Sequence, residues 1–181
     1  SGRVIAGVFD GRVLRLEEIC RFPNLPIEDE EGLHWDIDRI FADTKSGISH
    51  SASRFGEDVV SIGIDTWGLD YGLIDRYGKL IGLPFHYRDS RSQGIQAEVI
   101  ELLGRDWIYQ QTGIQFLPSN TLYQLLAEKK SSRSKLVQAE SLLFIPDLIN
   151  FWLTGIKINE VTIASTSQMY NTRTGEWAIP L

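Results

Sequence analysis

The chain has 181 residues, of which 43% are hydrophobic and 23% charged, with a formal net charge of −6 and a pI near 5.1. This length and composition allow a sizeable core and predict one large domain. The negative charge argues against nucleic acid or an anionic membrane surface as a partner. The single cysteine, Cys20, excludes a disulfide framework and a cysteine-rich zinc site, and it fits a reducing cytoplasm. No signal peptide or membrane-length apolar run is present.

The first third of the chain predicts a hairpin followed by a helix. Residues 4–9 form an apolar run before Asp10 and Gly11, a dipeptide favoured in tight hairpin turns. A half-buried return strand should follow, with alternating Leu14, Leu16, Cys20 and Phe22. The acidic run 28–31 predicts a solvated loop. Asp36 should cap a helix whose apolar residues share one face and which ends at Gly56.

The remaining two thirds alternate between strand and helix patterns. Residues 59–64 predict a buried core strand, and residues 71–74 and 79–81 a hairpin around 76–78. Helices are expected over 95–103, after Asp106, and after Ser119 or Asn120. Residues 129–135 predict an exposed loop. A short strand over 142–145 should lead into a helix with Pro146 as its first residue and Gly155 as its stop. These elements predict an α/β fold, a mixed sheet flanked by helices.

Polar and aromatic residues follow the expected strand 59–64, and such strand ends often form pockets for small polar ligands. Trp67 stands in the turn, where an indole can stack on a sugar ring. Asp65 and Asp70 bracket this turn and could serve as paired acid and base groups at a glycosidic bond. A structural hydrogen bond and a site role are equally plausible for Asp65. Asp36 and Asp38 are better explained by the start of a helix.

A second charged segment, residues 88–91, places two arginines beside a carboxylate. Arg88 and Arg91 could make directional bonds to sugar hydroxyls or phosphates, or a simple ion pair within the loop. The histidines His34, His50 and His86 are widely separated and show no metal-ligand spacing, so no metal ligand is predicted.

Several ordered blocks resemble the FGGY family of carbohydrate kinases over nearly the whole chain. The blocks are residues 64–70, 82–91, 108–124, 145–147, 153–155 and 162–168. The resemblance implies a ribonuclease H-like, actin-like ATPase fold with two domains, in which sugar and ATP meet in the cleft between them. Residues 1–181 would be most of the N-terminal domain, with its first strand, its end and the whole ATP domain outside this chain.

The resemblance also implies site residues and cofactors. Gly68 matches the glycine that contacts the sugar, and the same pocket would include Thr66, Trp67, Asp70, Arg88 and Asp89. Ser1, Gly2 and Arg3 match the end of a hairpin that binds nucleotide phosphates. ATP and Mg²⁺ are the implied cofactors, and the general-base aspartate would lie beyond Leu181.

The function implied is ATP-dependent phosphorylation of a ketose in the cytoplasm, with L-rhamnulose as the expected acceptor. The isolated fragment is expected to be inactive. A kinase for L-fuculose, L-ribulose or L-xylulose and a non-catalytic sugar-sensing domain are the alternatives. A glycosidase built on Asp65 and Asp70 is a more distant one.

Overall fold

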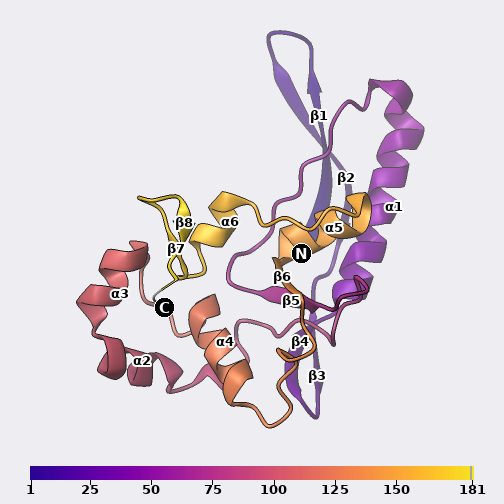
Figure 1. The fold of residues 1–181 in the computed structure, drawn as a ribbon. Coiled ribbons are helices and arrows are strands. Elements are labelled where there is room, and N and C mark those ends of the chain that lie inside the picture. The colour runs from indigo at the N-terminus through magenta and orange to yellow at the C-terminus, as the bar shows by residue number, and fades with distance from the viewer. Residues whose placement is uncertain (180) are drawn as a thin grey trace. The chain divides into compact units, whose positions relative to one another are not determined.

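The computed structural model describes residues 1–179 and 181, and they form two compact units (Figure 1). The first unit contains Ser1–Ile27 and Trp35–Ile64. The second contains Glu28–His34 and Asp65–Leu181. In the described part of the chain, no helix combines the length and the apolar character that crossing a membrane requires.

The first unit begins with an antiparallel hairpin of β1 (Gly2–Phe9) and β2 (Leu14–Phe22). The register runs from Gly2 opposite Phe22 to Phe9 opposite Leu14. Asp10 closes the turn, since its Oδ1 accepts hydrogen bonds from the backbone N–H of Arg12 and Val13, at 2.9 and 2.8 Å. The predicted hairpin is confirmed, although its loop extends from Asp10 to Val13 and is longer than a two-residue turn.

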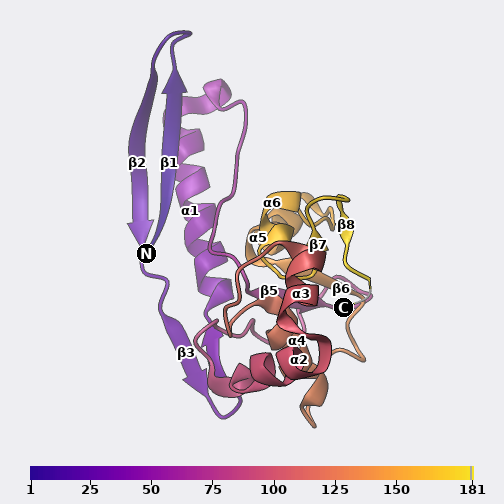
Figure 2. The same ribbon diagram turned by 90° about the vertical axis from the view of Figure 1, so that its left-hand side faces the viewer.

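Helix α1 (Ile37–Phe55) runs alongside this hairpin (Figure 2). The Asp36 side chain caps it by accepting from the Arg39 N–H, and Gly56 ends it, both as predicted. A 3₁₀ turn follows over Gly56–Asp58. The helix packs closely on the hairpin at Gly47, where a Cβ would lie 2.4 Å from Val4 Cγ2 and 2.7 Å from Cys20 Sγ. A larger residue at position 47 would therefore separate the helix from the hairpin.

Two apolar predictions for the first unit are wrong, the first of them in part. The return strand β2 is present, with Cys20 and Phe22 half-buried as expected, but Leu14 and Leu16 are exposed. Residues 59–64 form no strand, and Val60 is 92% exposed. A strand is stable only when a neighbour completes its backbone hydrogen bonds. Within residues 1–179, β1 pairs with β2 and no strand pairs with 59–64, so the strand-forming tendency of this run is not realised.

A second hairpin, β3 (Pro26–Asp29) and β4 (Gly32–Trp35), contributes residues to both units. The acidic run 28–31 is exposed as predicted, but it is not all loop, because Glu28 and Asp29 belong to β3 and only Glu30 and Glu31 form the turn. Asp29 Oδ1 accepts from the Glu31 N–H at 2.8 Å.

The second unit is organised around an antiparallel pair of short strands, β5 (Tyr71–Ile74) and β6 (Ser141–Phe144), with Tyr71 opposite Phe144. The chain turns back after β5 through Asp75 N–H to Lys79 O (2.8 Å) and a bridge between Ile74 and Leu80, so the predicted hairpin there is confirmed. The remaining elements are a 3₁₀ turn (Ser90–Ser92), α2 (Ile95–Leu103), α3 (Arg105–Thr112), α4 (Thr121–Lys130), α5 (Ile145–Thr154), α6 (Val161–Ser165), β7 (Tyr170–Asn171) and β8 (Glu176–Trp177).

The predicted helices of the second unit are present with small shifts at their ends. Helix α5 starts at Ile145, one residue before Pro146, and Gly155 ends it in a left-handed conformation. Helix α4 extends to Lys130, into the segment expected to be a loop. Two apolar clusters hold the unit together. One contains Ile95, Val99, Ile108, Leu122 and Tyr123, and the other Tyr71, Leu73, Phe144 and Ala164.

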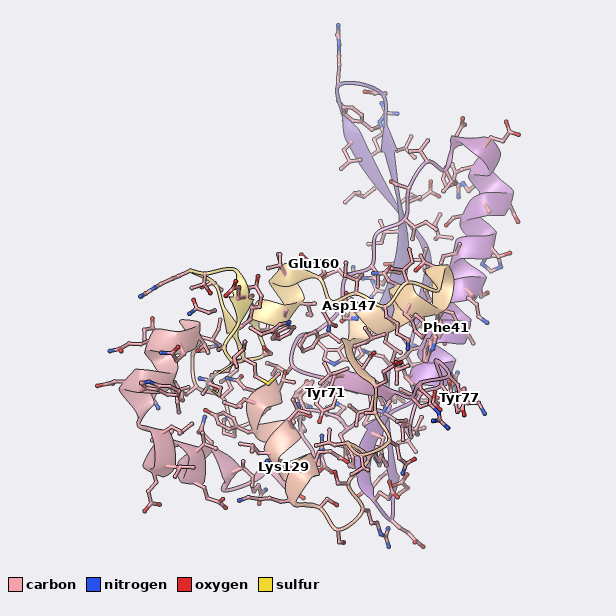
Figure 3. The ribbon with its side chains drawn as sticks, viewed as in Figure 1. Phe41, Tyr71, Tyr77, Lys129, Asp147 and Glu160 are labelled. Carbon is pink, nitrogen blue, oxygen red and sulfur yellow. The ribbon has the colours of Figure 1, made fainter. Side chains whose placement is uncertain are left out.

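The first turn of α5 buries a carboxylate, Asp147, which is 2% exposed and lies near Glu160 in Figure 3. Asp147 Oδ2 accepts from the Glu160 N–H at 3.3 Å. Burial is the main reason that the pKa of Asp147 rises to about 6. The hydrogen bond from the Glu160 N–H opposes this rise, and the charge of the Glu160 carboxylate adds to it. The folded state therefore binds this proton more tightly than the unfolded chain does.

We predict that Asp147→Asn stabilises the protein at neutral pH. A folded pKa above the unfolded value means that the unfolding free energy falls as pH rises through about 4 to 6, then levels off. Asparagine keeps an acceptor for the Glu160 N–H but carries no charge. The unfolding free energy of the variant should therefore exceed that of the unmodified protein by about 1–3 kcal/mol at pH 8 and by nearly nothing at pH 4. Urea unfolding at both pH values measures this difference.

Asp75 is the matched control because its carboxylate has the opposite shift. Backbone N–H groups of Lys79 and Tyr77 lower the pKa of Asp75. Asp75→Asn should therefore lose stability at neutral pH, where Asp147→Asn gains it. Equal unfolding curves for Asp147→Asn and the unmodified protein at pH 8 would contradict the buried-charge argument.

Candidate functional site

The predicted pocket residues Thr66–Asp70, here called the corner, lie directly before β5, and Asp70 anchors them. Its carboxylate is 0% exposed. Oδ2 accepts from Trp67 Nε1 at 2.9 Å and from the Tyr87 N–H at 3.1 Å, and Oδ1 accepts from Gln124 Nε2 at 2.9 Å. Asp70 thus joins the corner to α4 and to the segment after β5. Because Asp70 is buried and accepts from all three donors, its role is to hold the corner in place on the side away from solvent.

The backbone at the corner is in an unusual conformation. Leu69 has φ +79°, in the left-handed region that costs a non-glycine residue about 1–3 kcal/mol. Hydrogen bonds hold it on both sides. Its carbonyl accepts from Thr121 Oγ1 at 2.7 Å, and its N–H donates to Thr166 Oγ1 at 3.4 Å. The Asp70 N–H also closes back on the Gly68 carbonyl at 3.0 Å. Strain of this kind is retained where the surrounding structure enforces it.

Gly68 is required at the corner because another segment approaches it closely. A Cβ there would lie 2.9 Å from Thr166 Oγ1 and 3.2 Å from both Thr166 Cβ and Cγ2. The φ of Gly68 is outside the left-handed region, so packing explains the glycine and backbone conformation does not. Thr66, Trp67 and Gly68 are partly exposed, so this part of the corner is accessible to a ligand.

Arg88 and Asp89 have different roles. Asp89 is engaged by the protein, since Oδ2 accepts from the Leu33 N–H and Oδ1 from the Arg91 N–H, both at 2.8 Å. Arg88 is exposed, and its guanidinium carbon lies 5.3 Å from the centre of the Tyr87 ring. Because the Tyr87 N–H binds Asp70, the structure links the 88–89 segment to the corner. Asp65 is exposed, so burial does not require it to find a partner.

Behind the corner lies a buried ion pair that links α4 to the segment before α2. Arg91 Nη1 lies 3.0 Å from Glu128 Oε2, and Arg91 Nη2 donates to Gln124 Oε1 at 3.2 Å. The Arg91 guanidinium also stacks on the Phe85 ring, 3.7 Å from its centre. Arg91 therefore forms an ion pair, but with Glu128 of α4 and not within the loop as the alternative supposed.

A small cavity of about 20 Å³ lies beside this ion pair, lined by Tyr71, Phe85, Arg91, Glu128 and Lys135 among others. Tyr71, labelled in Figure 3, is buried, and burial raises the pKa of its hydroxyl. A space of this size holds about one water molecule. A sugar does not fit there, so the exposed side of the corner is the better candidate for a ligand.

The predicted phosphate-binding residues belong to the first unit. Ser1 precedes β1, and its Oγ accepts from Arg21 Nη1 at 3.3 Å. Gly2 starts the strand, and a Cβ there would meet the Phe22 ring at 2.1 Å. Arg3 is exposed. A hydroxyl and an exposed guanidinium are groups that suit a phosphate, although the Ser1 hydroxyl already bonds to Arg21 and Arg3 interacts with Glu18.

The histidines have packing roles or are exposed, as predicted. His34 is buried against Phe85, with ring centres 4.3 Å apart, and His50 is exposed. His86 Nδ1 accepts from the Arg88 N–H at 3.0 Å, and burial lowers the pKa of His86. Among residues 1–179 and 181, no group of three or more His, Cys, Asp and Glu side chains could hold a metal ion.

Solved structures define the class of fold. The chain is similar to ligand-bound xylulose kinase from Lactobacillus acidophilus, with a TM-score of 0.76 and 19% identity over 91% of this chain and 33% of that one. A kinase from Brucella ovis, described as a xyloylose kinase, gives a TM-score of 0.77 and 16% identity, over 97% and 36% of the two chains. These likenesses confirm the predicted actin-like α/β fold, but within the described residues the strands form separate two-stranded sheets and not the single mixed sheet that was expected.

Residues 8–181 match the model of the FGGY family of carbohydrate kinases, N-terminal domain, and the chain belongs to this family. It is 47% identical to a rhamnulokinase of Yersinia pestis over 98% of its length, and 44% identical to a rhamnulokinase of Oceanobacillus iheyensis over 100%. It covers 37% and 38% of these relatives, so it spans little more than a third of their length. The family match begins after Ser1–Arg3 and does not include the predicted phosphate-binding residues.

Sequence reasoning located the corner but missed the side chains that hold it. Thr121, Gln124 and Thr166 come from α4 and the end of α6, far along the chain from residue 69. All three fall within blocks that resemble the family, which is the only signal that pointed toward them.

Proposed function

We propose that the chain is most of the N-terminal domain of an ATP-dependent kinase that phosphorylates L-rhamnulose at O1. The observation that carries this proposal is the identity of 42–47% to proteins named rhamnulokinase across nearly the whole chain. Solved relatives named xylulose or gluconate kinase share only 14–19%. The remainder of the N-terminal domain and a second, ATP-binding domain would complete the enzyme.

In this proposal the corner positions the sugar. Gly68 would place its backbone against a sugar hydroxyl, with the Trp67 ring, Thr66 and Arg88 around it. Asp70 and Asp89 are engaged by protein donors, so they would act by holding the corner and the 88–89 segment. Phosphoryl transfer depends mainly on such positioning, because the attacking hydroxyl must lie in line with the γ-phosphate.

The other reacting groups would lie outside or at the start of this chain. A general-base aspartate beyond Leu181 would accept the hydroxyl proton. Ser1, Gly2 and Arg3 would contact the ATP phosphates, and Mg²⁺ would neutralise them. We place this ATP-dependent activity in the cytoplasm, where the one free cysteine of residues 1–181 would stay reduced.

We predict that the full-length protein releases ADP with L-rhamnulose faster than with L-fuculose, L-ribulose or L-xylulose, in a coupled assay of kcat/KM. Residues 1–181 alone should release none, because the base and the nucleotide domain are absent from them. Preference for another ketose would establish the alternative kinase. Sugar binding without turnover of any ketose would establish a sensor instead, and the kinase proposal would fail.

A further inference from the structure

Among the described residues, two non-glycine positions have a positive φ, Leu69 at +79° and Gln168 at +62°. They are 99 positions apart in sequence (168 − 69), and both are bound by the start of α4. Thr121 Oγ1 donates to the Leu69 carbonyl at 2.7 Å. Asn120 Nδ2 donates to Gln168 Oε1 at 2.9 Å, and the Leu122 N–H donates to the Ser167 carbonyl at 3.1 Å. One helix start therefore holds both strained positions.

The side chains that make these contacts are buried: Asn120, Thr121 and Gln168 are each 0% exposed, while Leu69 is half-buried. Buried hydrogen bonds of this kind are stronger than exposed ones, because little water competes for them. Thr121 is the first residue of α4, so no carbonyl of its own helix lies three or four residues before it for the hydroxyl to bond. Thr121 instead directs its hydroxyl out of the helix, to a backbone carbonyl 52 positions earlier. That bond is the shortest one that the Leu69 backbone makes.

We infer that Thr121 is a positioning residue that keeps the corner in its strained, ligand-ready form. This inference rests on the proposed function, in which Gly68 contacts the sugar. Without the Thr121 hydroxyl, the Leu69 carbonyl retains only the Gln124 amide, 3.5 Å away. Leu69 can then relax to an ordinary negative φ, which rotates the peptide joining it to Gly68. The sugar-facing backbone of Gly68 turns with that peptide, although Thr121 itself does not contact the sugar.

The test compares Thr121→Val with Thr121→Ser in the full-length kinase. Valine has the shape of threonine without the donor, so KM for L-rhamnulose should rise about tenfold, the effect of one lost hydrogen bond, while KM for ATP stays unchanged. Serine keeps the hydroxyl and should restore a near-normal KM for the sugar. Thr112→Val is the matched control, because Thr112 is also buried but its hydroxyl bonds within its own helix, to the Ile108 carbonyl at 3.1 Å.

A double substitution separates positioning from general stability. Glycine adopts a positive φ without strain, so Leu69→Gly removes the backbone strain at position 69 that the Thr121 hydrogen bond offsets. Thr121→Val should therefore raise the sugar KM less in combination with Leu69→Gly than alone. If Thr121→Val alone fails to fold, recovery of folding by Leu69→Gly supports the inference. The inference is overturned if Thr121→Val raises the sugar KM by the same factor with and without Leu69→Gly.

Hydrogen exchange gives a readout that does not need activity. The Asp70 N–H bonds to the Gly68 carbonyl, so its exchange reports directly on the corner. It should exchange faster in Thr121→Val than in Thr112→Val or the unmodified protein. An unmodified protein that phosphorylates no ketose refutes the proposed function, while the exchange result still decides the role of Thr121. Unchanged exchange together with an unchanged sugar KM overturns the inference.

Discussion

Replacing Gly68 with alanine in the full-length protein should lower kcat/KM for its ketose by about 100-fold, the effect expected when a reacting group is displaced by about 1 Å. The added methyl would lie 2.9 Å from Thr166 Oγ1, closer than real Cβ contacts occur. Because Thr166 lies against the corner and also bonds to the Leu69 N–H, the corner and the end of α6 must move apart. The kcat/KM values for sugar and for ATP measure the effect.

Two variants show whether the cause is the clash. Thr166→Ala removes the hydroxyl and one methyl facing Gly68, so adding it to Gly68→Ala should restore part of the activity. Gly63→Ala adds a methyl five positions earlier, where no atom lies within 4 Å, and should leave kcat/KM unchanged. If Gly68→Ala retains activity within about threefold, a loss too small for a displaced reacting group, the corner does not contact the sugar.

The successes and failures of sequence reasoning follow the range of the interactions involved. Helix ends were predictable because their signals are local, such as Asp36 before α1 and the glycines at positions 56, 104 and 155 after helices. Residues 59–64 carry an equally clear strand pattern, but a strand depends on a neighbour that the pattern does not specify. The same local reading therefore succeeded for the helices and failed for this segment.

The site shows the same division. The polar and aromatic composition of Thr66–Asp70 marked it as unusual, and the structure shows it to be strained and held from three directions. The sequence pattern pairs Asp65 with Asp70 around the turn, and only the family resemblance assigned Asp70 to the pocket, yet Asp65 is exposed and Asp70 is buried among three donors. The requirement for glycine at position 68 comes from Thr166, 98 positions away (166 − 68), and no local pattern reports such a contact.

Replacing Arg91 with methionine should cost about 3–5 kcal/mol of unfolding free energy, the range for breaking a buried ion pair by removing one partner. The side chains of Arg91 and Glu128 are only 17% and 6% exposed, so Glu128 would remain as an uncompensated charge. Methionine can fill the space against Phe85 but offers Glu128 no donor. Thermal and urea unfolding of the full-length protein measure the loss.

The matched comparisons separate buried charge from packing. Adding Glu128→Gln should recover most of the stability, because glutamine is neutral and still accepts from the Lys135 N–H, now bonded to Glu128 Oε1 at 2.6 Å. Lys157→Met breaks a more exposed pair, 2.9 Å from Glu140, and should change stability by less than about 0.5 kcal/mol. Similar losses in Arg91→Met and Lys157→Met would show that burial of the pair does not matter.

Arg91→Met should also reduce activity, because Arg91 orients an amide that the corner needs. The Gln124 oxygen accepts from Arg91 Nη2, which leaves its Nε2 directed to Asp70 Oδ1 and to the Ser119 carbonyl. Without the guanidinium, the Gln124 oxygen loses its donor, so the amide is fixed from the Nε2 side alone and its bond to Asp70 Oδ1 is held less firmly. Arg91→Met with Glu128→Gln should therefore recover stability without recovering the sugar KM, since neither change returns the donor that Gln124 lost.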